Sequence, residues 1–141
     1  AIAAAEAAAR GASAADVVAE VEALRPRVQT WAVTRDVSFA VRGGRIPAWA
    51  GRLVAALGLT PIARAKPNGR LAVAGALAGG PRAAPERFAR HLLKRLDPAR
   101  RWRLLVGHVD CAADAAALEL RLREALQADS LGVVEVGPAI G

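Results

Sequence analysis

Cysteine, tyrosine and methionine are almost missing from this sequence. The 141 residues include one cysteine, no tyrosine and no methionine, and aromatic residues make up 4% of the total. The single Cys111 excludes an internal disulfide and a zinc site built from several cysteines. The scarcity of aromatic side chains argues against a large aromatic binding platform.

Long apolar runs are also missing. No stretch reaches the roughly eighteen uncharged apolar residues that a membrane-spanning helix requires, and the Ala-rich start contains Glu6 where a secretory signal has bulky apolar residues. We therefore expect a soluble, cytoplasmic protein without stable membrane insertion. The sequence does not start with methionine and its first residues read as the middle of a helix, which predicts a fragment of a longer protein.

Alanine and arginine are abundant instead. The hydrophobic fraction is 54%, and the length suits one domain over residues 1–141 with a buried core. The net charge is +7, which permits binding of nucleic acid or of an anionic membrane. A GC-rich coding sequence would place arginine on solvated faces and explain the same charge, so we expect no nucleic-acid partner.

Helical patterns alternate with short strand patterns along the chain. Ser13 and Asp16 are typical of a helix start, and Pro26 ends that helix. Pro47 suits the first turn of another helix, which Gly58 ends. Further helices are predicted over 35–41, 85–96 and 114–128, and strands over 30–34, 61–66, 70–77, 103–109 and 131–136.

Pro67, Asn68 and Gly69 separate two of these strands and predict a β-hairpin, since asparagine and glycine tolerate the positive φ of tight turns. The hairpin interrupts the alternation of strands and helices. We therefore predict an α+β fold, a two-layer α/β arrangement with a mixed sheet, a β-hairpin and helices mainly on one face. No linker is long enough to divide the chain.

The pentapeptide 42–46 is the most informative motif. Gly43 and Gly44 remove side chains where the backbone turns sharply or approaches a ligand. Arg42 and Arg45 place bidentate donors beside exposed amides, an arrangement suited to carboxylate or phosphate. The positive end of the next helix would point to the same place. Chemistry alone favours a plainer interpretation, in which a turn ends a helix between two solvated arginines.

Taken in order, several motifs resemble the DegV family. The family's lysine-glycine-glycine-arginine-isoleucine run is matched by residues 42–46 except at its first position. Its leucine-rich helix and lysine-proline-isoleucine sequence are similar to residues 57–62. Its histidine-alanine-aspartate step is similar to residues 107–110, and its closing segment to residues 135–141. The ordered match covers nearly the whole chain and resembles the carboxy-terminal domain of a DegV protein.

The resemblance implies a lipid-binding module. DegV proteins have two domains that hold a fatty acid, and several are the acyl-carrying subunit of bacterial fatty acid kinase. The expected ligand is therefore a long-chain fatty acid, with no other cofactor, and the expected protein partner is a fatty acid kinase subunit. The chain itself would not be an enzyme, because the partner kinase would phosphorylate the bound acid. The groups that grip the carboxylate in the family lie outside these residues.

The resemblance also implies roles for particular residues. Arg42, Gly43, Gly44 and Arg45 would contact the ligand head group or the partner. The acyl chain would be lined by apolar residues of the next helix and strand, namely Ile46, Trp49, Leu53, Val54, Leu57, Pro61 and Ile62. Burial of an acyl chain at about 0.8 kcal/mol per CH₂ would supply ample affinity. From the residue pattern alone, these apolar residues are ordinary core.

One segment departs from the family. Where the family commonly has a lysine-valine-arginine-threonine-arginine run, residues 75–80 contain only glycine, alanine and leucine, and Arg82 is the nearest basic residue. This departure weakens the expectation of a kinase partner more than that of lipid binding. We predict no catalytic residue and no metal site. His108 lies near Asp110 and Cys111, but such close neighbours rarely converge without more partners, so a structural role is expected.

Two other interpretations stay open. The chain could be a non-catalytic relative of dihydroxyacetone kinase domains, which share the two-domain design but whose substrate histidine has no counterpart here. It could also be a basic nucleic-acid-binding module, which would require a contiguous arginine face and salt-dependent affinity.

Overall fold

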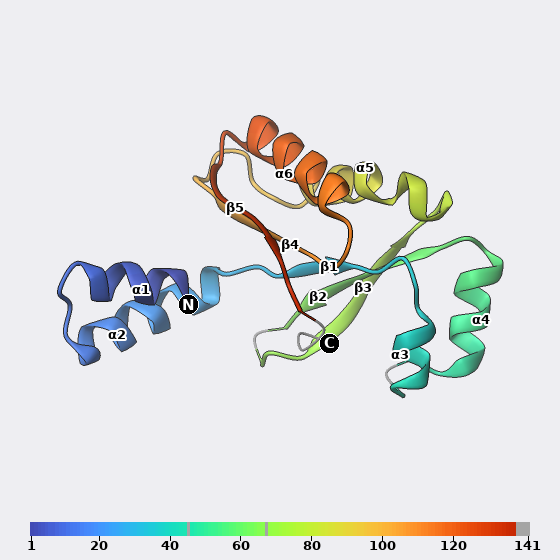
Figure 1. The fold of residues 1–141 in the computed structure, drawn as a ribbon, viewed down its shortest axis with the longest axis horizontal. Coiled ribbons are helices and arrows are strands. Elements are labelled where there is room, and N and C mark those ends of the chain that lie inside the picture. The colour runs from blue at the N-terminus through green and yellow to red at the C-terminus, as the bar shows by residue number, and fades with distance from the viewer. Residues whose placement is uncertain (45, 67, 138–141) are drawn as a thin grey trace. The chain divides into compact units, whose positions relative to one another are not determined.

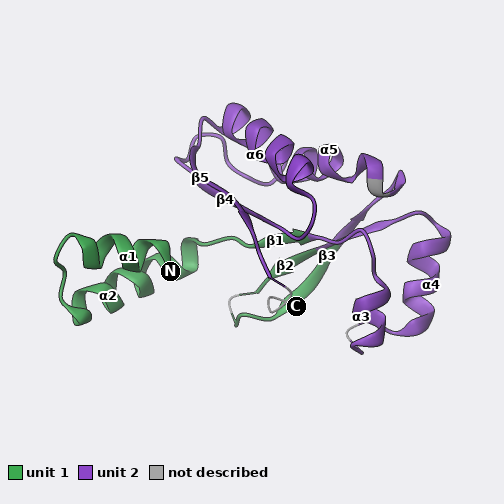
Figure 2. Cartoon of the chain, viewed as in Figure 1, with its two compact units in different colours: residues 1–32, 63–74 green, residues 33–62, 75–141 purple. Residues whose placement is uncertain are grey.

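A computed structural model describes residues 1–44, 46–66 and 68–137. The chain divides into two compact units, shown in Figure 2. One unit contains Ala1–Ala32 and Ala63–Ala74, and the other contains Val33–Ile62 and Gly75–Gly141. Each unit is built around its own packed elements (Figure 1).

The first unit begins with two helices that pack on each other, α1 (Ile2–Ala9) and α2 (Ala14–Leu24). The predicted start of α2 is confirmed. Ser13 Oγ accepts a hydrogen bond from the Asp16 backbone N–H at 3.3 Å, and the Asp16 carboxylate accepts one from the Ser13 N–H at 3.3 Å. This reciprocal pair satisfies two amides that the helix leaves unpaired. A 3₁₀ turn, Arg25–Arg27, follows and includes the predicted Pro26 stop.

Strands β1 (Trp31–Val33), β2 (Thr60–Ala65) and β3 (Leu71–Leu77) form a sheet in the order β1-β2-β3. The predicted hairpin joins β2 to β3. The Lys66 N–H donates to the Arg70 carbonyl at 2.9 Å, and Gly69 has φ +80°. Pro67, which also belongs to the predicted turn, lies outside the described residues. Gly69 therefore has the positive φ that the sequence suggested, whereas Asn68 does not; its side-chain oxygen instead accepts a hydrogen bond from the Arg70 N–H at 3.1 Å.

The second unit has a parallel strand pair, β4 (Arg103–His108) and β5 (Asp129–Glu135), connected by α6 (Ala112–Leu126). Helix α6 packs on both strands and on α5 (Gly80–Leu93), as Figure 1 shows. The core of this unit is formed mainly by side chains of these helices and the residues just after them: Ala84, Phe88, Ala89, Leu92, Leu96, Ala115, Leu122, Leu126 and Ala128.

The α+β class with mixed sheets is confirmed. The strands in the described part of the chain are divided between a three-stranded and a two-stranded sheet, whereas one sheet was expected. Helix α5 begins at Gly80, so the predicted start at Pro85 was wrong. Gly79 adopts φ +93° before the helix and Pro81 lies in its first turn, where a missing N–H costs nothing.

Two further helices complete the second unit, α3 (Ser38–Arg42) and α4 (Ala48–Ala56), and they contact each other. We call them the α3–α4 hairpin. No helix in the described residues is long and apolar enough to cross a bilayer. The same residues contain no cluster of three or more side chains that could ligate a metal.

Candidate functional site

The α3–α4 hairpin contains most of the residues that the sequence singled out. Its first helix starts where the Asp36 carboxylate accepts a hydrogen bond from the Ser38 N–H at 2.8 Å. That backbone bond, followed by one from the Ser38 hydroxyl, holds the pKa of Asp36 below its usual value. The Thr34 hydroxyl donates to the Asp36 carbonyl at 2.9 Å. Local hydrogen bonds thus define the entry into α3.

The predicted turn after α3 is formed as expected. The Gly43 N–H donates to the Phe39 carbonyl at 2.9 Å, and Gly44 has φ +69°, which a residue with a side chain rarely adopts. The Ile46 N–H returns to the Ala40 carbonyl at 3.2 Å. Arg45, the second arginine of the motif, lies outside the described residues.

Helix α4 begins one residue after Pro47, which occupies the position before the first helical residue. The Pro47 carbonyl accepts hydrogen bonds from the Ala50 and Gly51 N–H groups at 3.0 and 3.1 Å. At the other end Gly58 has φ +58°, so the predicted glycine stop is confirmed.

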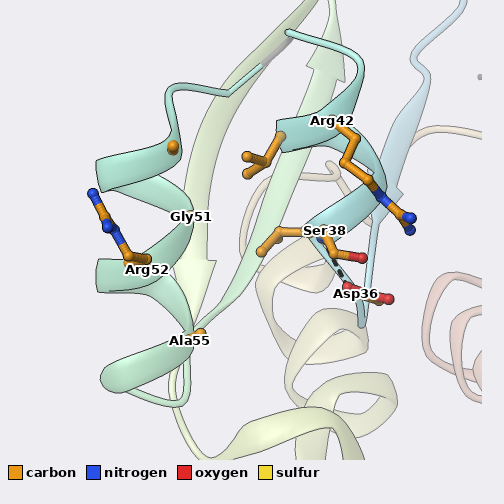
Figure 3. A pocket seen from close by; sticks show the side chains of 9 residues that line it. Asp36, Ser38, Arg42, Gly51, Arg52 and Ala55 are labelled. Carbon is orange, nitrogen blue, oxygen red and sulfur yellow. Dashed lines mark hydrogen bonds between the residues drawn. The ribbon is translucent and has the colours of Figure 1, made fainter.

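An open groove of about 540 Å³ lies between the two helices (Figure 3). Gly51 is the buried residue of α4, and a Cβ atom on it would lie 2.4 Å from Val41 Cγ2. Because real Cβ atoms do not approach so closely, this glycine sets the separation of the helices. The groove is lined by Asp36, Val37, Ser38, Val41, Arg42, Ala48, Gly51, Arg52 and Ala55.

The two arginines of the groove do not converge. Figure 3 shows the Arg42 and Arg52 side chains extending away from each other, from α3 and α4 respectively. The Arg42 guanidinium lies over the Phe39 ring, 4.5 Å from its centroid. The groove therefore offers an apolar surface between its walls and no two-arginine site for a single anion.

The apolar stripe predicted for acyl binding lies on other positions of α4 than the groove. Trp49, Leu53 and Leu57 are 66%, 52% and 59% exposed. They recur every four residues, whereas the groove-lining Ala48, Gly51, Arg52 and Ala55 follow the i, i+3, i+4, i+7 pattern of another helix face. The plain interpretation of these three large side chains as ordinary core does not hold within this chain.

The other predicted lining residues are more buried. Ile46, Val54 and Pro61 are half-buried, and Ile62 in β2 is fully buried. The structure brings Ile46, Trp49, Leu53, Val54 and Leu57 into the α3–α4 hairpin, while Pro61 and Ile62 belong to the following strand.

Sequence reasoning missed most of the groove. Its helix α4 wall is made of small residues, Ala48, Gly51 and Ala55, which are common in an Ala-rich chain and give no distinct signal. Their spacing of three and four residues was the available indication of a closely packed helix face. Val37 and Val41 supply the opposite wall from α3.

A structural role was expected for His108, and it stays a prediction. His108 is the last residue of β4, half-buried, and its Nδ1 atom is buried without a hydrogen-bond partner in the described part of the chain. Its carbonyl accepts a hydrogen bond from the Val136 N–H at 2.8 Å. Nothing in this arrangement orients the imidazole toward a nucleophile.

Several arginines are paired with carboxylates on different elements. Arg10 lies 2.8 Å from Glu20, Arg121 lies 3.3 Å from Glu86, and Arg101 lies 3.3 Å from Asp129. Such exposed pairs contribute little stability, but they offset part of the positive charge. The described residues thus give no specific support to the nucleic-acid interpretation.

Comparison with known proteins identifies a family. The family model described as DegV family, uncharacterised protein, matches residues 1–141. No curated protein matches the chain.

Solved structures of DegV family proteins share the fold. One, from Eubacterium eligens and loaded with heptadecanoic acid, superposes with a TM-score of 0.80 at 18% identity, over 96% of this chain and 48% of that protein. A fatty-acid-binding DegV family protein from Thermus thermophilus is 31% identical, with a TM-score of 0.66, over 97% of this chain and 49% of that one.

A third structure is the fatty acid kinase B3 protein of Streptococcus pneumoniae, loaded with linoleic acid. Its TM-score is 0.71 at 20% identity, over 92% of this chain and 45% of that protein. The chain therefore spans about half the length of the proteins it resembles.

Proposed function

Because the chain belongs to the DegV family, we propose that it is a fatty-acid-binding module that shields the acyl chain from water and catalyses no reaction by itself. The observation that supports this most is that relatives matched over almost the whole chain hold fatty acids, including one at 31% identity. The expected ligand is a long-chain fatty acid, and no other cofactor is proposed.

The α4 stripe is the proposed acyl contact. Trp49, Leu53 and Leu57 recur every four residues, and each is more than half exposed. Exposed apolar side chains that recur along one helix favour a partner or a ligand over water. Ile46, Val54, Pro61 and Ile62 are proposed to complete the lining beside this stripe.

The turn at 42–46 is the proposed contact for the head group or a partner. Gly43 and Gly44 are exposed, and Arg42 supplies a guanidinium that lies over the Phe39 ring and whose charge also helps to lower the pKa of Asp36. Arg45 is included because it matches the family motif. An arginine beside open backbone suits a carboxylate or an acyl phosphate.

The proposal extends to a protein partner, a kinase subunit. The similarity to a fatty acid kinase B3 protein supports it, and a kinase subunit would then phosphorylate the acid held by this module. The glycine- and alanine-rich segment 75–80 lacks the basic side chains expected there. We therefore expect any kinase contact to depend more on the 42–46 turn than on this segment.

The test is to identify and then perturb the ligand. Full-length protein purified from bacteria is extracted under denaturing conditions and analysed by mass spectrometry, and we expect about one long-chain fatty acid per protein. Leu53→Asp should weaken fatty acid binding by more than about tenfold, because it places a charge where an apolar contact is expected.

The matched control is Leu120→Asp. Leu120 is 45% exposed on α6 and Leu53 is 52% exposed on α4, so both changes introduce the same charge at a similarly exposed leucine. Binding should be unchanged in the control. Protein that is empty as purified and ignores added fatty acid would contradict the function, and equal loss in both variants would contradict the proposed site.

A further inference from the structure

The α3–α4 hairpin has little buried surface of its own to hold it in place. Helix α3 has no buried residue, and Gly51 is the buried residue of α4. By contrast, α6 in the same unit buries Ala115, Glu119, Leu122 and Leu126. Elements with few buried apolar side chains open at low free-energy cost. The position of the hairpin therefore depends strongly on how its two ends are attached.

One attachment is an ion pair at the start of the hairpin. The Arg35 guanidinium lies against the Asp114 carboxylate, which belongs to the first turn of α6. The side chains are 47% and 38% exposed, but the Asp114 Oδ2 atom itself is buried. That oxygen is covered while the Arg35 guanidinium lies on it, and loss of the arginine would remove this cation and let water reach the carboxylate.

The ion pair is linked to α3 through a short, hydrogen-bonded segment. Thr34 Oγ1 donates to the Asp36 carbonyl at 2.9 Å, and the Asp36 carboxylate accepts from the Ser38 N–H at 2.8 Å. Arg35 lies between these bonds. A displacement of Arg35 would therefore move the first turn of α3 with it.

The other attachment is a backbone contact at the far end of the hairpin. The Gly80 N–H, at the start of α5, donates to the Gly58 carbonyl at 3.1 Å. Gly58 and Gly80 have φ +58° and +73°. Glycine rotates about φ and ψ more freely than any other residue, so this end is suited to act as a pivot.

We propose that Arg35 is a positioning residue: its ion pair with Asp114 ties the segment leading into the α3–α4 hairpin to the first turn of α6, while the Gly58–Gly80 contact is the pivot. The two attachments differ in kind. The ion pair depends on charge and is weakened by salt, whereas the backbone contact is insensitive to both. The orientation of the α4 stripe is therefore under electrostatic control.

Hydrogen exchange of the full-length protein, measured by mass spectrometry, tests the proposal. In Arg35→Gln we expect exchange over residues 38–56 to become about fivefold faster, since one kcal/mol of lost stabilisation changes an opening equilibrium by that factor. Exchange over α6 and β4 should stay unchanged. Arg35→Lys keeps the charge and should exchange nearly as the natural protein does.

Arg101→Gln is the matched control. Arg101 also pairs with a carboxylate distant in sequence, Asp129, at 3.3 Å in the same unit. Its removal should leave exchange over residues 38–56 unaltered. In the natural protein, added salt should speed exchange in the hairpin, and in Arg35→Gln it should not.

Three results would overturn the proposal: no change over 38–56 in Arg35→Gln, an equal change in Arg101→Gln, or faster exchange throughout the unit. A second readout rests on the proposed function. If the stripe binds a fatty acid, Arg35→Gln should release it about fivefold faster at unchanged stoichiometry. A protein that binds no fatty acid would refute the function alone, because the exchange experiment needs no ligand.

Discussion

The helix pairs α5–α6 and α3–α4 belong to the same unit and are both rich in alanine, but they bury very different side chains. Phe88, Leu92 and Leu122 of the first pair are at most 5% exposed. Trp49 and Leu53 of the second are 66% and 52% exposed. The first pair therefore stabilises the fold, whereas the second keeps large apolar side chains available on its surface. The difference separates residues that hold the unit together from exposed residues that are proposed to bind the ligand.

The sharpest test of this comparison uses one substitution in both pairs. Leu92→Ala should lower the free energy of unfolding by about 2–5 kcal/mol, because it removes buried methyl groups and leaves a cavity. Leu53→Ala should lower it by less than about 0.5 kcal/mol, since an exposed side chain loses little on truncation. Urea denaturation of the ligand-free protein measures both. Similar losses would show that α4 is part of the core after all.

A smaller effect on stability is expected at Gly51, where α3 and α4 are closely packed. Gly51→Ala should destabilise the hairpin by about 1 kcal/mol, because strain against Val41 exceeds the helix propensity gained. Val41→Ala should restore most of this loss in the double variant. Circular dichroism during thermal unfolding, together with hydrogen exchange over α3 and α4, would measure the change. A single variant as stable as the natural protein would mean that the helices separate at no cost.

The smallest effect is a pH dependence confined to the first pair. Burial, followed by the charges of Arg95 and Lys94, lowers the pKa of His91 on α5 below its ordinary 6.5. The unfolded chain then binds a proton at a higher pH than the folded one. Stability that is present above about pH 6.5 should therefore fall as the pH drops through the lowered folded-state pKa.

The control for this prediction is His91→Gln, which cannot titrate. The free energy of unfolding is measured by urea denaturation between about pH 5 and 7.5, the range in which histidine titrates. It should depend less on pH in that variant. An identical slope in both proteins would assign the effect to other groups.

Much of the fold was predictable because its signals are local. The Ser13 cap, the Asn68-Gly69 turn and the Gly58 stop each depend on hydrogen bonds or φ values within a few residues. Helix α5 shows the limit. The Gly79-Gly80-Pro81 sequence indicated a break, but the structure starts a helix there, because glycine before the helix and proline in its first turn are both compatible with helix initiation.

The candidate site was predictable only in part. The motif at 42–46 and the periodic residues of α4 pointed to the α3–α4 hairpin, where the structure has the groove, and the resemblance to the DegV family supplied the proposed ligand class. The groove between α3 and α4 was not predicted, because its α4 wall consists largely of small residues such as Gly51 and Ala55, whose helical spacing does not stand out in an Ala-rich chain. Gly51 shapes the groove because it lies against Val41, which belongs to another helix.

The sequence by itself determined the family, the α+β class and the places where most helices and strands begin and end, since each follows from residues close together along the chain. Only the tertiary structure decided which face of α4 meets α3, and that Arg35 meets Asp114 on a helix far along the chain. The physical reason is that the spacing of apolar residues along a helix shows that the helix has an apolar face. Which neighbour covers that face, and whether any does, depends on packing between distant segments.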